Sequence, residues 1–233
     1  MNVIFCGYRQ WASDVFKELA NHPKVNCIKI IKSNEEYLFH VDSFGDNIDF
    51  ILFLGWSWII PPEITKKYLC LGIHPSDLPN YRGGSPLQHQ IINGVVKSKV
   101  TLMTLSSEKL DGGEIWLKED LDLSGNTMDE IFLHLVTSSK KLLKNFIENY
   151  SSIKPQQPKL DEGSYYKRRL PSQSEITLNQ LQEMSLLDIY NFIRCLTDPY
   201  PNAYISDKEG NKLLFKEVAF ISVDDKNKTI TES

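Results

Sequence analysis

Residues 50–55 read Phe-Ile-Leu-Phe-Leu-Gly, a continuous apolar run that ends at a glycine. An unbroken apolar pattern of this length is typical of a strand buried on both faces of a parallel sheet, because a strand with one wet face alternates. Three further apolar runs of the same kind occur at residues 3–6, 27–31 and 68–73. The sequence therefore predicts at least four buried strands in its first third.

Helical spacing separates these runs. Trp11, Val15, Phe16 and Leu19 recur at helical intervals after the first strand, and residues 127–150 carry a long amphipathic pattern. Two more strands are predicted at 99–105 and 114–118. Strands that alternate with helices indicate an α/β fold, here an open, mostly parallel, twisted sheet flanked by helices. Ligands of such sheets bind beyond the carboxyl ends of the strands.

The chain divides near residue 150. Residues 151–160 contain two prolines and two glutamines and predict a linker. We expect a catalytic α/β domain over residues 1–150 and a small C-terminal region over residues 151–233. A helix at 186–196 and a hairpin at 203–215 are predicted in the second part, which is too small to bury a core alone. It must pack on the sheet domain or on a second subunit.

Composition excludes several classes of protein. The chain has 233 residues, 41% hydrophobic and 24% charged, with a net charge of -4, which is globular and argues against a nucleic-acid polymer as main partner. No apolar run approaches the roughly 20 residues of a membrane span, and the N-terminus lacks a signal peptide pattern. Gly7 opens no G-x-G-x-x-G motif, and the four scattered cysteines suggest neither a metal site nor a disulfide. We expect a cytoplasmic protein without a metal.

The segment Gly72-Ile-His-Pro-Ser-Asp-Leu-Pro-Asn-Tyr-Arg-Gly-Gly-Ser-Pro86 carries the densest signal. His74 stands where a predicted strand leaves the sheet, in a loop fixed by prolines and glycines, which is more typical of a binding loop than of a spacer. Asp111 lies in a second bend, Leu110-Asp-Gly-Gly113. A carboxylate beside an imidazole can support acid–base chemistry, although a loop histidine and a turn aspartate are also ordinary structural features.

These two blocks resemble the 10-formyltetrahydrofolate-dependent formyltransferases. The matching residues are His74-Pro-Ser-x-Leu-Pro-x-Tyr-Arg-Gly83 and Leu110-Asp-x-Gly-x-Ile115. A third block, Tyr166-Lys-Arg-Arg-x-Pro171 with Thr197-Asp-Pro-Tyr-Pro-x-Ala203, is similar to the branch that formylates nucleotide-linked amino sugars. The resemblance covers roughly residues 1–215. It departs from the family at Gly72, where the family has an asparagine that helps hold the formyl oxygen.

The resemblance implies a site. His74 and Asp111 match the catalytic pair of that family. This pair would catalyse the attack of an amine on the formyl carbon without a covalent enzyme intermediate. Trp58 and Ile59 would meet the folate, and Ser76, Asp77, Leu78, Pro79 and Gly83 would continue that site. The residues expected at the acceptor are Tyr8, Arg9, Arg82, Arg168 and Arg169. An arginine suits phosphate, but each of these could equally be a solvated or subunit-contact residue.

The function expected is transfer of a formyl group from 10-formyltetrahydrofolate to the amino group of a nucleotide-linked amino-dideoxy sugar, for surface polysaccharide of the O-antigen type. By the same resemblance, a homodimer is expected. The short stretch after position 160 places methionyl-tRNA second as an acceptor, because formyltransferases for that substrate carry a further C-terminal barrel. Glycinamide ribonucleotide is a third possible acceptor. A hydrolase that releases formate and a folate or nucleotide-sugar binder that has lost catalysis are compatible with the same residues.

Overall fold

Six strands form the central sheet of the computed structural model, which describes residues 1–106 and 108–222. Their order is β2-β1-β3-β4-β6-β7, with β1 to β4 parallel and β6 and β7 joined antiparallel at one edge. The predicted open, mostly parallel sheet is confirmed. Its strands are β1 (Asn2–Cys6), β2 (Asn26–Ile31), β3 (Phe50–Phe53), β4 (Cys70–His74), β6 (Lys97–Thr104) and β7 (Ile115–Asp122).

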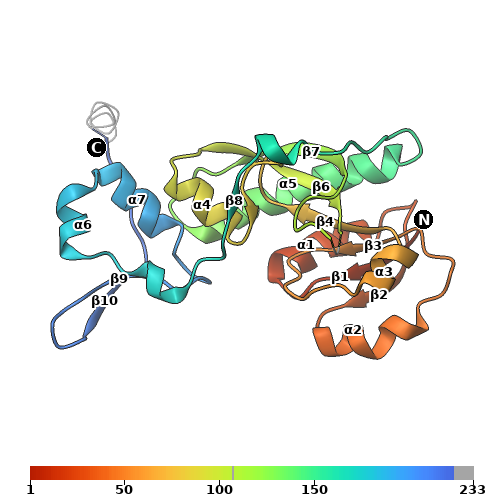
Figure 1. Cartoon of the computed structure of the whole chain (residues 1–233), viewed down its shortest axis with the longest axis horizontal. Helices are drawn as coiled ribbons and strands as arrows, with labels where there is room; N and C mark the ends of the chain where they lie inside the picture. The colour runs from red at the N-terminus through yellow and green to blue at the C-terminus, as the bar shows by residue number, and fades with distance from the viewer. Residues whose placement is uncertain (107, 223–233) are drawn as a thin grey trace, which may run out of the picture.

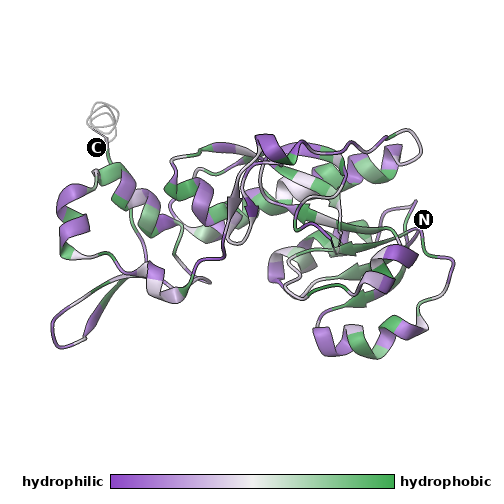
Figure 2. Cartoon of the chain, in the orientation of Figure 1, coloured by the Kyte–Doolittle hydropathy of each residue, from purple (hydrophilic) through white to green (hydrophobic). Residues whose placement is uncertain are grey.

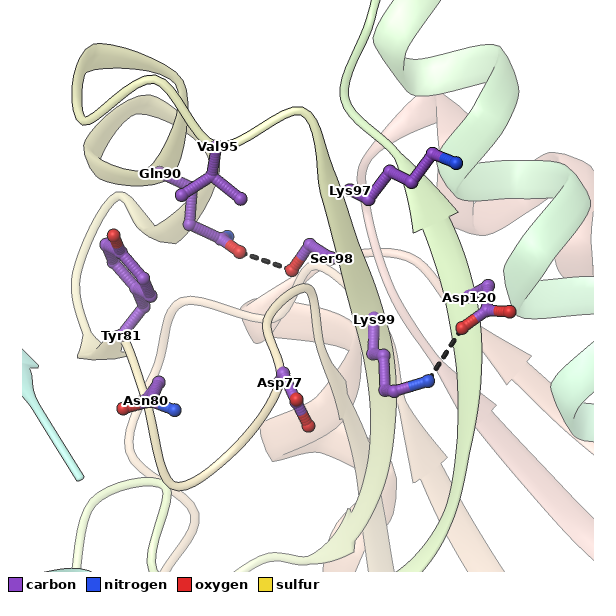
Figure 3. Close-up of a pocket in the computed structure, with 9 residues that line it drawn as sticks. All are labelled: Asp77, Asn80, Tyr81, Gln90, Val95, Lys97, Ser98, Lys99 and Asp120. Carbon is purple, nitrogen blue, oxygen red and sulfur yellow. Dashed lines mark hydrogen bonds and ion pairs between the residues drawn. The ribbon is translucent and has the colours of Figure 1, made fainter. Parts of the chain in front are cut away.

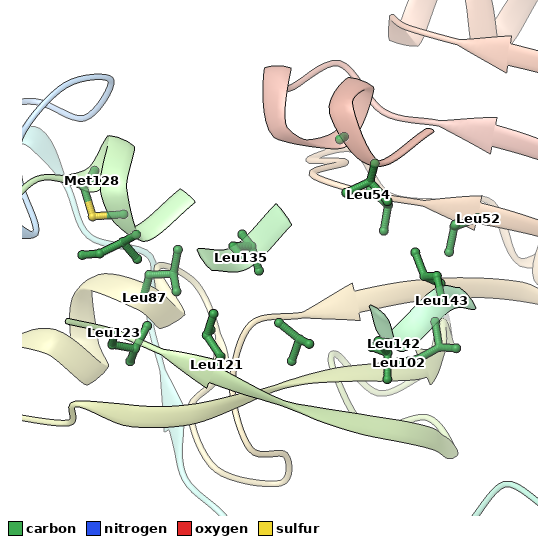
Figure 4. Close-up of a cluster of buried hydrophobic side chains, with 14 of the residues drawn as sticks. Leu52, Leu54, Leu87, Leu102, Leu121, Leu123, Met128, Leu135, Leu142 and Leu143 are labelled. Atoms are coloured by element: carbon green, nitrogen blue, oxygen red, sulfur yellow. The ribbon is translucent and has the colours of Figure 1, made fainter. Parts of the chain in front are cut away.

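Helices cover both faces of this sheet. Alternate residues of the strands enter two clusters, so that Phe50 and Leu52 pack on one side and Ile51 and Phe53 on the other. Helices α1 (Gln10–Leu19) and α5 (Met128–Asn149) close the first side, and α2 (Asn34–His40) and α3 (Pro62–Lys67) close the second. Figure 2 shows β1 and β3 mostly in the green of apolar residues. Figure 4 shows leucines of the first cluster, with Leu102 and Leu121 on the β6–β7 pair, Leu135, Leu142 and Leu143 on α5, and Leu52 and Leu54 at β3.

The C-terminal region packs on this core. It contains α6 (Leu178–Glu183), α7 (Leu186–Arg194) and a hairpin of β9 (Ala203–Ser206) and β10 (Lys212–Phe215), gathered at one end of the molecule (Figure 1). Arg194 is 3% exposed and donates to the carbonyls of Leu123 at 2.7 Å and Gly125 at 3.0 Å. Ile193 joins the same apolar cluster as α5. Residues 223–233 of the region expected over 151–233 lie outside the described residues.

A strap connects the two parts. Residues 160–170, here called the strap, cross the loop formed by residues 74–85, and the two-residue strands β5 (Arg82–Gly83) and β8 (Tyr165–Tyr166) pair in parallel. Helix α4 (Pro86–Ile92) begins directly after this loop. Short 3-10 turns span Val41–Ser43, Leu160–Glu162 and Pro171–Ser174. Among residues 1–106 and 108–222, no helix combines the length and apolarity that a membrane crossing requires.

Candidate active site

A cavity of about 1310 Å³ lies beyond the carboxyl ends of β1, β3 and β4, bounded by the strap and the C-terminal region. This is the edge of the sheet at which an α/β fold places its ligands. Eight of the residues selected from the sequence line it, and these are Arg9, Trp58, Ile59, His74, Gly83, Asp111, Arg168 and Arg169. The structure therefore gathers residues that are up to 160 positions apart in the chain around one space.

Residues 76–79 do not line that cavity. Ser76 is fully buried and its Oγ donates to the carbonyl of Asn80 at 2.7 Å, while Leu78 is 1% exposed. Asp77 borders a separate cavity of about 330 Å³, between the loop and β6 (Figure 3), and Lys118 donates to its carboxylate at 2.5 Å. Pro79 accepts a hydrogen bond from the strap through its carbonyl. These four residues shape the loop behind the cavity wall.

Two residues expected at the acceptor are also held by the protein itself. The hydroxyl of Tyr8 pairs with Ser57 at 2.7 Å, and its ring contacts that of Trp58, which lines the cavity. Arg82 donates from Nη2 to the carbonyl of Leu160 at 3.1 Å, so its guanidinium faces the strap. Neither side chain lines the cavity directly.

His74 and Asp111 meet at the cavity wall. The imidazole Nδ1 lies 3.6 Å from the Asp111 carboxylate Oδ2, and the two side chains are 7% and 11% exposed. The separation is too long for a direct hydrogen bond but short enough for an electrostatic pair. The same Oδ2 accepts the backbone N–H of Gly83 at 2.8 Å. Asp111 has a positive φ of 50°, a backbone state that asparagine and aspartate adopt more readily than most residues.

The other ring nitrogen of His74 already makes a hydrogen bond within the protein. Its Nε2 lies 2.8 Å from the carbonyl oxygen of Tyr81. A carbonyl only accepts, so Nε2 carries a proton and donates, and Nδ1 is the nitrogen left to exchange a proton beside Asp111. The pair thus has one defined exchange position at the cavity wall.

The loop that carries His74 is anchored from the sheet side by two buried polar residues. Thr101 on β6 donates from Oγ1 to the carbonyl of Ser76 at 2.7 Å. Gln90 on α4 donates from Nε2 to the carbonyls of Pro75 at 2.7 Å and Pro86 at 2.9 Å. Satisfied buried polar groups of this kind hold a loop in one conformation.

Gly72 has a neighbour that explains its lack of a side chain. A Cβ at this position would lie 2.7 Å from Cδ2 and 3.1 Å from Cγ of Leu105, which follows β6. Leu105 itself lines the cavity. The space beside His74, where the resembling family has an amide, is therefore occupied by an apolar side chain from the neighbouring strand.

One end of the cavity is aromatic. Trp56 and Trp58 contact each other with ring centroids 4.9 Å apart, and both line the cavity. The indole Nε1 of Trp56 is buried and has no hydrogen-bond partner among the described residues. Flat apolar surface with a free donor fits a heteroaromatic ring that offers an acceptor. The residues present at this end thus suit a pterin.

A second part of the cavity wall is cationic. Arg9 and Arg168 both lie near the side chain of Tyr200, which hydrogen-bonds Gln88. Burial raises the pKa of Tyr200, and the two arginines act against that increase. Tyr200 and Gln88 were not predicted from the sequence. Only the folded structure brings them into the cavity wall beside Arg9 and the strap residue Arg168. The Thr197-to-Pro201 run was the available signal.

Arg169 borders the same end in a different way. Its guanidinium lies over the Phe192 ring at 5.4 Å, and its backbone N–H donates to Ser85 Oγ at 3.1 Å. Burial lowers the pKa of this guanidinium. Nε has no partner among the described residues. No group of three or more metal-ligating side chains occurs in residues 1–106 and 108–222.

Known proteins share this architecture. The formyl transferase family model matches residues 11–144, which is more than half of the chain. A methionyl-tRNA formyltransferase of Rickettsia massiliae is 36% identical over 163 residues, covering 69% of this chain and 52% of its own length. The chain thus spans about half the length of that curated relative.

Solved structures match over nearly the whole chain. A methionyl-tRNA formyltransferase from Clostridium thermocellum has a TM-score of 0.74 at 33% identity, covering 94% of this chain and 99% of that one. A sugar N-formyltransferase from a Shewanella species has a TM-score of 0.74 at 18% identity, covering 95% and 99%. HypX from Aquifex aeolicus, in complex with tetrahydrofolic acid, has a TM-score of 0.74 at 20% identity, covering 91% and 36%. The last two show the shared fold, and the family match shows that this chain belongs to the formyl transferase family.

Proposed function

We propose that this protein transfers a formyl group from 10-formyltetrahydrofolate to a primary amine. The observation that carries the proposal is the cavity of about 1310 Å³, which has the His74–Asp111 pair in its wall and is lined by both aromatic and cationic side chains. A pocket for one small ligand usually measures about 300–1,000 Å³. The larger volume suits two ligands that meet at His74, a flat ring system at Trp56 and Trp58 and an anionic acceptor at Arg9 and Arg168.

The chemistry needs only proton exchange from the chain. The formyl-folate supplies an activated formyl carbon, to which the amine nitrogen bonds while the bond from that carbon to the folate nitrogen breaks. One proton leaves the amine and one is returned to the folate nitrogen. Nδ1 of His74 and the carboxylate of Asp111 are the groups placed to relay it.

The curated and solved relatives favour methionyl-tRNA as the acceptor. At 36% and 33% identity they are closer in sequence than the sugar-modifying structure at 18%. The chain covers 52% of the length of the curated relative, so this preference rests on the matched part alone.

A nucleotide-linked amino sugar is the second candidate, and the geometry of the acceptor end favours it. Residues 168–171, Leu196 and residues 198–201 of the chain itself line that part, and Arg9, Arg168 and Tyr200 are all in the cavity wall. Two guanidinium groups with a phenol suit a diphosphate and a sugar hydroxyl. This arrangement accommodates a compact anionic acceptor within the chain.

The test offers both acceptors to one protein. The protein is mixed with 10-formyltetrahydrofolate and either methionyl-tRNA or a panel of dTDP-, UDP- and GDP-linked amino sugars, and the folate product is followed by absorbance. We expect turnover with one acceptor class, and that class identifies the substrate. Formate release without any acceptor would instead indicate a hydrolase. Bound folate with no turnover across both classes would contradict the proposal.

His74→Asn tests the chemical assignment. We expect kcat to fall by about 10²–10⁴-fold, the usual contribution of a positioned acid–base group, while folate binding is retained. His40→Asn is the matched control, because His40 ends α2 on the other face of the sheet. Near-normal turnover in His74→Asn would exclude His74 as the proton-exchanging group.

A further inference from the structure

Tyr81 links His74 to a distant part of the chain. Its carbonyl oxygen accepts the Nε2 proton of His74 at 2.8 Å. Tyr81 has a φ of 57°, which is the left-handed region and is unfavourable for a residue with a bulky side chain. A strained residue of this kind persists only where its surroundings hold it. The position of the carbonyl that fixes the imidazole therefore depends on what holds Tyr81.

The strap holds it by two contacts, and Asn93 at the end of α4 adds a third. Ser164 Oγ accepts the backbone N–H of Tyr81 at 2.9 Å. The ring of Tyr166 stacks on the ring of Tyr81, with centroids 5.1 Å apart and planes 9° apart. Asn93 donates from Nδ2 to both phenol oxygens at 3.2 Å. Of these contacts, only the one from Ser164 acts on the backbone of Tyr81.

The pairing of β5 with β8 also affects Asp111. The Gly83 N–H that donates to the Asp111 carboxylate belongs to β5, which pairs with β8 of the strap. Arg82 donates its N–H to the carbonyl of Ser164 at 3.0 Å, and Gly84 donates to the carbonyl of Tyr166 at 2.9 Å. One segment of the loop thus supplies the acceptor for His74 and the donor for Asp111, and the strap lies along it.

We propose that Ser164 is a positioning residue for the acid–base pair, which fixes the Nε2-protonated form and the orientation of His74 through the backbone of Tyr81. The inference rests on the proposed formyl transfer and extends it to a residue that does not line the cavity. A positioned group loses much of its effect when it moves slightly, because a displacement of about 1 Å can cost about 10²-fold in rate. Ser164 makes two further bonds through its backbone, which substitution leaves in place.

Ser164→Ala is the decisive variant. It removes the hydroxyl but keeps the backbone bonds from residue 164 to Pro79 and Arg82. We expect kcat to fall by about tenfold, within the 10²-fold range for a small misplacement, while KM for the folate and for the acceptor stays within about twofold. Ser164→Thr, which keeps a hydroxyl, restores kcat. Ser152→Ala is the control, because its Oγ donates to the carbonyl of Asn149 at the end of α5, away from the strap.

A second measurement does not depend on turnover. The ¹⁵N spectrum of the histidine rings, with the His74 signals identified by their loss in His74→Asn, reports which ring nitrogen carries the proton. We expect a protonated Nε2 in the original protein and a mixture of both forms in Ser164→Ala. Identical His74 signals in the two proteins, or an unchanged kcat in Ser164→Ala, would overturn the positioning role. Failure of the original protein to use any acceptor would instead overturn the proposed function, and the spectra would still decide the role of Ser164.

Discussion

At the scale of single residues, side chains contributed by neighbouring strands decide what lies beside the acid–base pair. Leu105 follows β6 and fills the space that a side chain at Gly72 on β4 would take, at 2.7 Å from the position of its Cβ. Gly72 and Leu105 therefore depend on each other, because the large side chain of Leu105 occupies the space that a side chain at position 72 would need. Substitution of either one changes the surroundings of His74.

This pairing predicts non-additive effects on stability. Gly72→Asn places atoms against Leu105 and is expected to lower the free energy of unfolding by about 1–3 kcal/mol, the usual cost of overpacking. Leu105→Ala opens the space, so the double variant should be more stable than the sum of the two single effects predicts, by about 0.5–3 kcal/mol. Urea unfolding of all four proteins measures the difference. Additive effects would show that the two positions do not share this space.

The sequence predicts His74 and Asp111 as a site through the two motif blocks that resemble the formyltransferases, and the structure brings the two side chains within 3.6 Å. Their surroundings could not be predicted. Nothing local to Leu105 indicates that it faces Gly72, since that depends on the register of β4 with β6. Ser164 and Tyr200 act through residues far away in the chain. Arg82 carries a charge that suggested a ligand, but its partner is a carbonyl of the strap.

At the scale of elements, the approach of the strap to the 74–85 loop depends on a glycine. A Cβ at Gly163 would lie 2.1 Å from the carbonyl oxygen of Pro79, which accepts the N–H of the next residue, Ser164. The φ of Gly163 is -105°, which any residue can adopt. Glycine is thus needed here for space and not for backbone freedom.

Gly163→Ala is expected to push the strap away from the loop. The free energy of unfolding should fall by about 1–3 kcal/mol, and formyl transfer should fall with it, because the contacts to Tyr81 and Arg82 begin at the next residue. Gly45→Ala is the matched control, since a Cβ there meets nothing within 4 Å. Chemical denaturation and steady-state kinetics of both variants provide the test. Equal effects of the two substitutions would exclude a close-packed strap.

Elements with long apolar patterns were predictable, and the short ones were not. The six strands, α1, α5, α7 and the β9–β10 hairpin follow from periodicity in the sequence. Helices α2 and α3 have seven and six residues, which is too short for a clear helical period. The pairing of β5 with β8 involves two residues on each side. Such a contact depends on the folded position of the strap and leaves no local pattern.

At the scale of the whole molecule, burial of weak acids makes stability depend on pH. Burial raises the pKa of the Cys70 and Cys195 thiols to about 12. An unfolded cysteine has a pKa of about 8.5. The folded state therefore holds these protons more tightly. Their contribution to stability is fully present below pH about 8.5 and is lost as the pH rises toward 12.

We expect the free energy of unfolding to fall above pH about 8.5, by up to about 1.4 kcal/mol per pH unit for each of the two thiols. Urea unfolding at pH 8 and pH 10 measures this slope. Cys195→Ala should reduce the slope, and Cys27→Ala should reduce it less, because Cys27 is only partly buried. If the dependence of the free energy of unfolding on pH is unchanged in Cys195→Ala, the Cys195 thiol does not have the raised pKa that its burial predicts.

The strap has a consequence for how the protein is made. A ribosome releases His74 and Asp111 well before it releases residues 160–170, and the sheet that carries the pair is complete by Asp122. Nascent chains fold from the N-terminus onward. The partners that fix Tyr81 and Gly83 are therefore missing until the strap emerges. Translation itself delays assembly of the His74–Asp111 site, so a chain interrupted before the strap carries both residues without the contacts that hold them in place.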